Sequence, residues 1–177
     1  MRLLVRLQHS PLILIQHSVE MKHGVALQQV LPHPACKGER GHVQTDGGLQ
    51  QSGINDKDNC TIRAFAIGYG MSYKDAYKMG ELAGREHGKG YWMYKIMDKA
   101  REFGYNSIEL NGYGTLSAFL KKNNTGRFIC VRRGHAFAVL DGKIYDAITN
   151  KGQCKLIRIF KVESRGIKSY IQENFCV

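Results

Sequence analysis

Residues 58–70 read DNCTIRAFAIGYG, and this stretch predicts the first main element of the fold. Its apolar side chains recur at helical spacing on one face, at Ile62, Phe65, Ala66 and Tyr69. Asp58 and Asn59 precede that face, and both residue types cap helix N-termini. Gly70 follows the last apolar position and provides a natural end. The stretch therefore predicts a buried helix with Cys60 in its first turn.

The residues after this helix predict two more helices before a sheet begins. Ser72, followed three residues later by Asp75, starts a helix that we expect to reach about His87. A further helix is expected over about residues 91–103, where a glycine follows. The first half of the domain is therefore predicted to be helical.

The second half of the chain alternates turn residues with β-rich runs. A strand over residues 107–110 and a helix from Thr115 to about Lys122 lead into four such runs. These are residues 127–132, 135–140, 143–148 and 155–162. Asp141-Gly142, between the second run and the third, is typical of a two-residue hairpin turn. The pattern predicts an α+β fold in which N-terminal helices are followed by an antiparallel β-sheet.

The chain of 177 residues is long enough for one domain of ordinary size and too short for two. Residues 1–53 show no sustained helical or strand period, and residues 38–53 read as a linker rich in Gly, Gln and charge. We expect an irregular arm over residues 1–53 and the folded domain over residues 54–177. Lys37-Gly38-Glu39 can be encoded by a purine-rich stretch that resembles a ribosome-binding site, and Val43, a few codons later, can be read as a GTG start codon. Residues 1–42 are then a translated upstream region, or alternatively a genuine arm that docks on a partner.

Basic residues outnumber acidic ones, with 26 Lys and Arg against 15 Asp and Glu and a formal net charge of +11. Such a surface favours an anionic partner, either nucleic acid or an acidic protein. No arginine-rich run or ribonucleoprotein motif accompanies the charge. No run approaches the roughly 20 apolar residues that a membrane span needs, and the apolar run 12–15 is too short for a secretion signal. Neither a membrane span nor a signal is therefore expected.

The chain has five cysteines, an odd number at wide spacing, which does not suggest a disulfide framework. A reducing, cytoplasmic location is therefore expected. No pair forms CxxC and the histidines complete no standard zinc spacing, so neither a metal nor another cofactor is predicted. Cys130 lies inside a strand pattern and is interpreted as core. Cys36, Cys154 and Cys176 have no partner pattern.

Cys60 is the candidate nucleophile. A thiol attacks as the thiolate, and the partial positive charge of a helix N-terminus lowers a thiol pKa. The base must come from elsewhere in the fold, and His135 is the histidine that lies in a strand pattern. With period two, His135 shares a face with Phe137 and Val139, and we expect that face to pack against the helix of Cys60.

A third group must hold the imidazole in the correct orientation. For a two-residue loop, Leu140 pairs with Lys143 and Phe137 with Asp146, which places Asp146 near the His135 end of the hairpin. Asp146 is therefore the predicted orienting residue. Asn150 is the reserve candidate.

An oxyanion formed at the site needs hydrogen-bond donors. The backbone N–H of Cys60 is one donor, and an upstream side-chain amide is the expected second donor. Asn55 and Asn59 are the candidates, with Gln50 and Gln51 as more distant options. The sequence leaves the choice open.

Two neighbouring features have simpler structural interpretations. Arg63, one turn after Cys60, is expected to cap an internal carboxylate or to face solvent rather than to contact substrate. Trp92, with Tyr91 and Tyr94, is expected to anchor the core rather than to line a substrate cleft.

Several strings resemble small papain-like cysteine-peptidase-fold proteins, many of them encoded by bacteriophages and prophages. They are residues 58–66 (DNCTIRAFA), 73–76 (YKDA), Thr115-Leu116 with Phe119-Leu120, and 134–139 (GHAFAV) with Asp141-Gly142 and Tyr145-Asp146. The resemblance covers roughly residues 54–148. It implies a papain-like fold with catalytic residues at Cys60, His135 and Asp146. The glutamine that papain-type sites place before the nucleophile has no counterpart, because Ile54 stands in that region.

These observations lead to two alternative functions. In the first, a Cys-His-Asp site hydrolyses an amide or isopeptide bond in a protein or peptide substrate, as a cysteine peptidase does. In the second, an inactive papain-fold protein binds nucleic acid or another anionic partner through its basic surface, for example as a virion component. The resemblance implies a host-cell cytoplasmic or virion-associated location.

Overall fold

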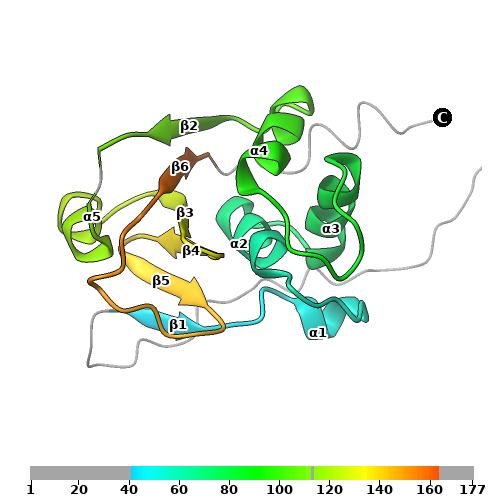
Figure 1. The fold of residues 1–177 in the computed structure, drawn as a ribbon, viewed down its shortest axis with the longest axis horizontal. Helices are drawn as coiled ribbons and strands as arrows, with labels where there is room; N and C mark the ends of the chain where they lie inside the picture. The colour runs from blue at the N-terminus through cyan, green and yellow to red at the C-terminus, as the bar shows by residue number, and fades with distance from the viewer. Residues whose placement is uncertain (1–40, 113, 164–177) are drawn as a thin grey trace, which may run out of the picture. The chain divides into compact units, whose positions relative to one another are not determined.

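The computed structural model describes residues 41–112 and 114–163, which form an α+β fold (Figure 1). The helices are α1 (Leu49–Ser52), α2 (Cys60–Tyr69), α3 (Tyr73–Leu82), α4 (Met93–Glu102) and α5 (Leu116–Lys122). The strands are β1 (His42–Gln44), β2 (Ser107–Leu110), β3 (Arg127–Arg132), β4 (His135–Leu140), β5 (Lys143–Asp146) and β6 (Arg158–Val162). The predicted fold class is confirmed at this level.

The six strands form one sheet in the order β1-β5-β4-β3-β6-β2. Neighbouring strands are antiparallel except β1 and β5, which are parallel. Leu140 lies opposite Lys143, as the two-residue loop predicted. Asp141 and Gly142 have φ angles of 48° and 74°, the left-handed conformation that a type I′ turn requires. The turn therefore sets the register that brings the end of β5 back to the start of β4.

The predicted domain start at Ile54 is wrong, because the folded unit already includes β1 and α1. His42 lies opposite Ile144, whose N–H donates to the Gly41 carbonyl at 2.6 Å. Residues 42–52 are therefore structured, where a linker was expected. A strand of three residues is too short to show a period, and its partner is about 100 residues away in the chain. The start near Val43 stays a prediction, and the arm before residue 41, Cys36 and Cys176 lie outside the described residues.

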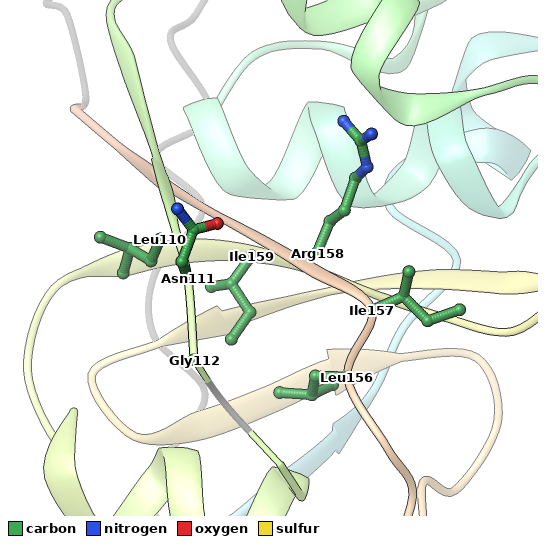
Figure 2. A pocket seen from close by; sticks show the side chains of 7 residues that line it. All are labelled: Leu110, Asn111, Gly112, Leu156, Ile157, Arg158 and Ile159. Carbon is green, nitrogen blue, oxygen red and sulfur yellow. The ribbon is translucent and has the colours of Figure 1, made fainter.

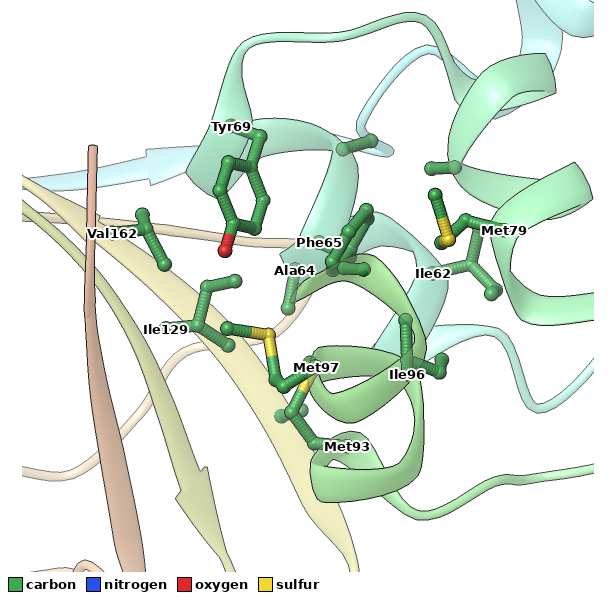
Figure 3. Close-up of a cluster of buried hydrophobic side chains, with 14 of the residues drawn as sticks. Ile62, Ala64, Phe65, Tyr69, Met79, Met93, Ile96, Met97, Ile129 and Val162 are labelled. Atoms are coloured by element: carbon green, nitrogen blue, oxygen red, sulfur yellow. The ribbon is translucent and has the colours of Figure 1, made fainter. Parts of the chain in front are cut away.

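Helix α2 packs against one face of the sheet, and α3 packs against α2 and α4 in the same apolar cluster. Ile62 and Phe65 are fully buried in this cluster, where Figure 3 shows Ile62 beside Met79 of α3 and Ile96 of α4, and Met97 of α4 beside Ile129 of β3. Ala136 of β4 belongs to the same cluster. This packing places the first turn of α2 over the beginning of β4.

The opposite face of the sheet has its own apolar cluster. Phe137 and Val139 of β4 pack there with Leu116 and Phe119 of α5. The expectation that these two side chains face α2 is therefore wrong. The alternation of side chains along a strand sends Ala136 toward α2 and sends Phe137 and Val139 toward α5.

The predicted helix bounds agree with the structure to within about two residues, except at the end of α3. Ser72 caps α3 by accepting a hydrogen bond from the Asp75 N–H at 3.2 Å, as expected. The helix ends at Leu82 instead of His87, shortly before Gly84 turns the chain with a φ of 92°. Within residues 41–112 and 114–163, every helix is too short or too polar to cross a bilayer.

The contact between α2 and β3 depends on a glycine. A Cβ atom at Gly68 would lie 2.5 Å from Cγ1 of Ile129. Overpacking a filled core costs about 1–3 kcal/mol, and the better helix propensity of alanine returns at most ~1 kcal/mol. We expect Gly68→Ala to lower the free energy of unfolding by about 1–2 kcal/mol in urea denaturation.

The matched control is Gly114→Ala. Nothing lies within 4 Å of a Cβ atom at Gly114. This variant should unfold within about 0.5 kcal/mol of the wild type. Equal stabilities for the two variants would show that α2 does not pack on β3 as described.

Candidate active site

Cys60 is the first residue of α2 and lies over the beginning of β4. Asn59 occupies the N-cap position, but its side chain makes no capping hydrogen bond. It donates instead from Nδ2 to the carbonyl of Asp56 at 2.7 Å. Asp58, the other predicted cap, has a left-handed φ of 46°. The helix start was predicted correctly, whereas side-chain capping was not.

His135 and Asp146 meet across the β4–β5 hairpin. Nε2 of His135 lies 2.6 Å from Oδ2 of Asp146, and both side chains are largely buried. The predicted pairing of these two residues is present in the structure. Because Nε2 faces the carboxylate, Nδ1 is the ring nitrogen that can hydrogen-bond to the Cys60 sulfur.

Asp146 is held by three further groups. The Ala147 N–H donates to Oδ1 at 2.7 Å, and Asn150 donates from Nδ2 to Oδ2. Nη2 of Arg63 lies 3.8 Å from Oδ1, so Arg63 accompanies an internal carboxylate, one of its two expected roles. Asn150 was the reserve orienter for His135. It contacts Asp146 instead, and its own oxygen accepts from Nε of Arg132 at 3.0 Å.

The Cys60 thiol has a pKa below its ordinary value. Burial acts to raise this pKa, but hydrogen bonding to His135 and to the backbone N–H of Ala136 outweighs that effect. Thr61 Oγ1, 3.9 Å from the sulfur, acts in the same direction. The thiol therefore ionises at a lower pH than an ordinary cysteine does.

The pKa of His135 moves the other way. Burial acts to lower it, while hydrogen bonding and charge from Asp146 and from Cys60 together raise it to about 9. The pKa of Asp146 is lowered despite burial, chiefly by the hydrogen bonds of His135 and Asn150. Between the lowered Cys60 pKa and about pH 9, the favoured state is a thiolate beside an imidazolium.

The other described cysteines lack this environment. Cys130 is fully buried, and burial raises its pKa strongly, with a further contribution from Cys154. Burial likewise raises the pKa of Cys154. Cys130 is a core residue, as predicted.

The two predicted oxyanion donors lie in different surroundings. Asn59 uses its amide on Asp56, and Asn55 is exposed on the loop before α2. The more distant candidates Gln50 and Gln51 line a cavity of about 390 Å³. Gln44, Thr45, Asp46 and Ala147 complete its lining. Because Ala147 follows Asp146, this polar cavity flanks the site on the β1 side of the sheet.

A second cavity lies between β2 and β6 and is much smaller, about 70 Å³ (Figure 2). Leu110 and Asn111 line it from one strand, and residues 156–159 line it from the other. Within the part of the chain that the structure describes, no group of three or more His, Cys, Asp or Glu side chains is arranged to hold a metal ion.

A buried ion pair supports the loop that leads into Cys60, and sequence reasoning missed it. Nη2 of Arg85 donates to Oδ1 of Asp56 at 2.9 Å, with both side chains at most 1% exposed. The Tyr73 hydroxyl donates to Oδ2 at 2.6 Å, and the Gly88 N–H donates to Oδ1 at 3.1 Å. Asp56 and Arg85 stand 29 residues apart, so no local pattern signals their contact.

Comparison of the chain with protein-family models, with curated proteins and with solved structures finds no match.

The role of Asp146 in raising the pKa of His135 can be measured. Asp146→Asn keeps the shape of the side chain and removes its charge, so the pKa of His135 should fall from about 9 toward its ordinary 6.5. NMR titration of the His135 ring protons measures the change. Asp141→Asn, in the turn of the same hairpin, removes the same charge and should shift that pKa by only a few tenths. Similar small shifts in both variants would contradict the pairing.

The ion pair beneath the Cys60 loop gives a stability test. Arg85→Met should lower the free energy of unfolding by about 3–5 kcal/mol, because it leaves Asp56 buried without its partner. Arg101→Met, at an exposed pair with Asp98, should cost no more than about 1 kcal/mol. Urea denaturation of both variants measures the difference, and equal losses would refute the structural role of Arg85.

Proposed function

We propose that this protein is a thiol-dependent hydrolase of the papain-like class that cleaves an amide or isopeptide bond in a protein or peptide. The observation that carries the proposal is the 2.6 Å contact between His135 and Asp146 in a site where the Cys60 pKa is lowered. A nucleophile, a base and an orienting carboxylate are together what covalent acyl transfer needs.

The reaction follows from the protonation states. The Cys60 thiolate attacks the carbonyl carbon, and the oxyanion forms near the backbone N–H groups at the start of α2. The C–N bond then breaks, and Nδ1 of His135 gives its proton to the leaving amine. His135, now neutral, takes a proton from water as the water attacks the thioester. Breakage of the C–S bond releases the acid and restores the thiolate beside the imidazolium.

The supporting residues act on Asp146. Asn150 and the Ala147 N–H hold the carboxylate, so that His135 keeps Nδ1 directed toward the thiol. Arg63 adds a positive charge 3.8 Å from Oδ1, which keeps Asp146 ionised. These residues are positioning residues in the proposed mechanism.

Two observations support the papain-like assignment and the cellular setting. The nucleophile begins a helix, and the base and the carboxylate follow on neighbouring strands, in the order that the resemblance implies. Cys60, Cys130 and Cys154 are free thiols, which supports a reducing, cytoplasmic location.

Alkylation by iodoacetamide tests the proposal. With peptide mass mapping at pH 7, Cys60 should be labelled at least about tenfold faster than Cys154, whose pKa is raised. The rate should rise through the lowered pKa of Cys60. Peptide hydrolysis, which also needs imidazolium, should fall again above about pH 9. His135→Ala should return Cys60 to slow labelling.

A proteome-derived peptide library gives the functional readout. Wild type should create new peptide termini that Cys60→Ala does not create. Slow labelling of Cys60 together with identical libraries would exclude the hydrolase. Salt-sensitive nucleic-acid binding that survives Cys60→Ala would then favour the basic binding protein suggested by the net charge of +11.

A further inference from the structure

Trp92 is an exposed aromatic residue, contrary to the expectation that it anchors the core. Its exposed fraction is 66%, and it precedes the first residue of α4. The ring of Tyr94 lies 6.3 Å from it, centroid to centroid. We call Trp92 and Tyr94 the aromatic patch. Tyr94 itself is half-buried and packs against the core cluster, so the exposed surface of the patch is that of Trp92. An exposed aromatic side chain near a reactive group can bind apolar side chains.

One hydrogen bond fixes the residue before Trp92 to the first turn of α2, the turn that carries Cys60. Thr61, which follows Cys60, donates from its hydroxyl to the Tyr91 carbonyl at 3.0 Å. Trp92 is the next residue in the chain. The start of α4 is therefore fixed against the first turn of α2.

A second set of contacts connects Cys60 to the Tyr94 ring of the patch through strands β4, β3 and β6. The Ala136 N–H interacts with Cys60, and Ala136 lies opposite Val131 of β3. Val131 in turn lies opposite Arg158 of β6. The guanidinium of Arg158 lies over the Tyr94 ring, 4.9 Å from its centroid. Figure 2 shows Arg158 extending from β6 toward the helices.

The sheet order separates this patch from the polar cavity. The cavity lies beside β1 and β5, whereas Arg158 reaches the patch from β6, beyond β3. His135 on β4 stands between the two sides. The candidate active site therefore has a polar side lined with glutamines and an apolar, aromatic side.

The chemistry of the patch favours an apolar ligand over an acidic one. Arg158 is the cation at the patch, and its charge is balanced by Glu109, with Nη1 and Oε1 3.4 Å apart. Its stacking on Tyr94 limits the motion of that ring. The surface of the patch that is open to a ligand is the exposed face of Trp92. An aromatic or large aliphatic group buries the most apolar area against that ring.

We propose that the aromatic patch is a substrate subsite that takes an aromatic or large aliphatic side chain within two residues of the attacked carbonyl. This rests on the proposed hydrolase function of Cys60 and adds its side-chain preference. Trp92 is then the specificity-determining residue.

Three acetylated dipeptidyl chloromethyl ketones test the subsite: Ala-Ala, Phe-Ala and Ala-Phe. One of the phenylalanine probes should alkylate Cys60 about three- to tenfold faster than Ala-Ala does. Trp92→Ala should remove that preference and Trp92→Phe should keep most of it. The matched control is Ile108→Ala, on β2 and 60% exposed, which should keep it fully. Because the chain has a single tryptophan, its emission should shift with the preferred probe and not with Ala-Ala.

Iodoacetamide separates this inference from the proposed function. Trp92→Ala should leave labelling of Cys60 by this small reagent within about twofold of wild type, because the patch contacts only the larger probes. Equal rates for the three probes, or a preference that survives Trp92→Ala, would overturn the subsite while fast iodoacetamide labelling leaves the hydrolase in place. Slow iodoacetamide labelling in the wild type, together with identical peptide libraries for wild type and Cys60→Ala, would overturn both.

Discussion

The hydrogen bond between His135 and Asp146 is the interaction on which the candidate site depends. It joins two adjacent strands at 2.6 Å and occupies Nε2, which directs the other ring nitrogen to Cys60. Hydrogen bonding and charge from Asp146 and from Cys60 together keep His135 protonated to about pH 9, and the protonated ring in turn stabilises the thiolate. Without the carboxylate, the His135 pKa would fall toward its ordinary value, and the thiolate would lose part of the positive charge that stabilises it.

The rest of the fold holds the three groups in place from different directions. The Asp141-Gly142 turn sets the register between β4 and β5, and burial of α2 against the sheet brings Cys60 over the start of β4. The Asp56–Arg85 pair holds the loop before the nucleophile.

The sequence predicted the parts of the site that depend on local geometry. A two-residue turn fixes which residues face each other, so Asp146 could be placed near His135, and helical spacing placed Cys60 at a helix start. Contacts between distant residues carry no such signal. The parallel strand β1 and the Asp56–Arg85 pair were therefore missed, and the Asn59 amide turned to a carbonyl instead of capping. Trp92 was misplaced because composition does not distinguish a buried aromatic from an exposed one.

The proposed mechanism depends on the protonation state of Cys60, which ultraviolet difference titration measures directly. Subtracting the spectrum of Cys60→Ser from that of the wild type isolates the thiolate absorbance of this residue. We expect the thiolate to form below the ordinary thiol pKa of about 8.5. We also expect Asp146→Asn to move that transition upward. A transition at or above the ordinary value in the wild type, unchanged by Asp146→Asn, would contradict the thiolate–imidazolium pair.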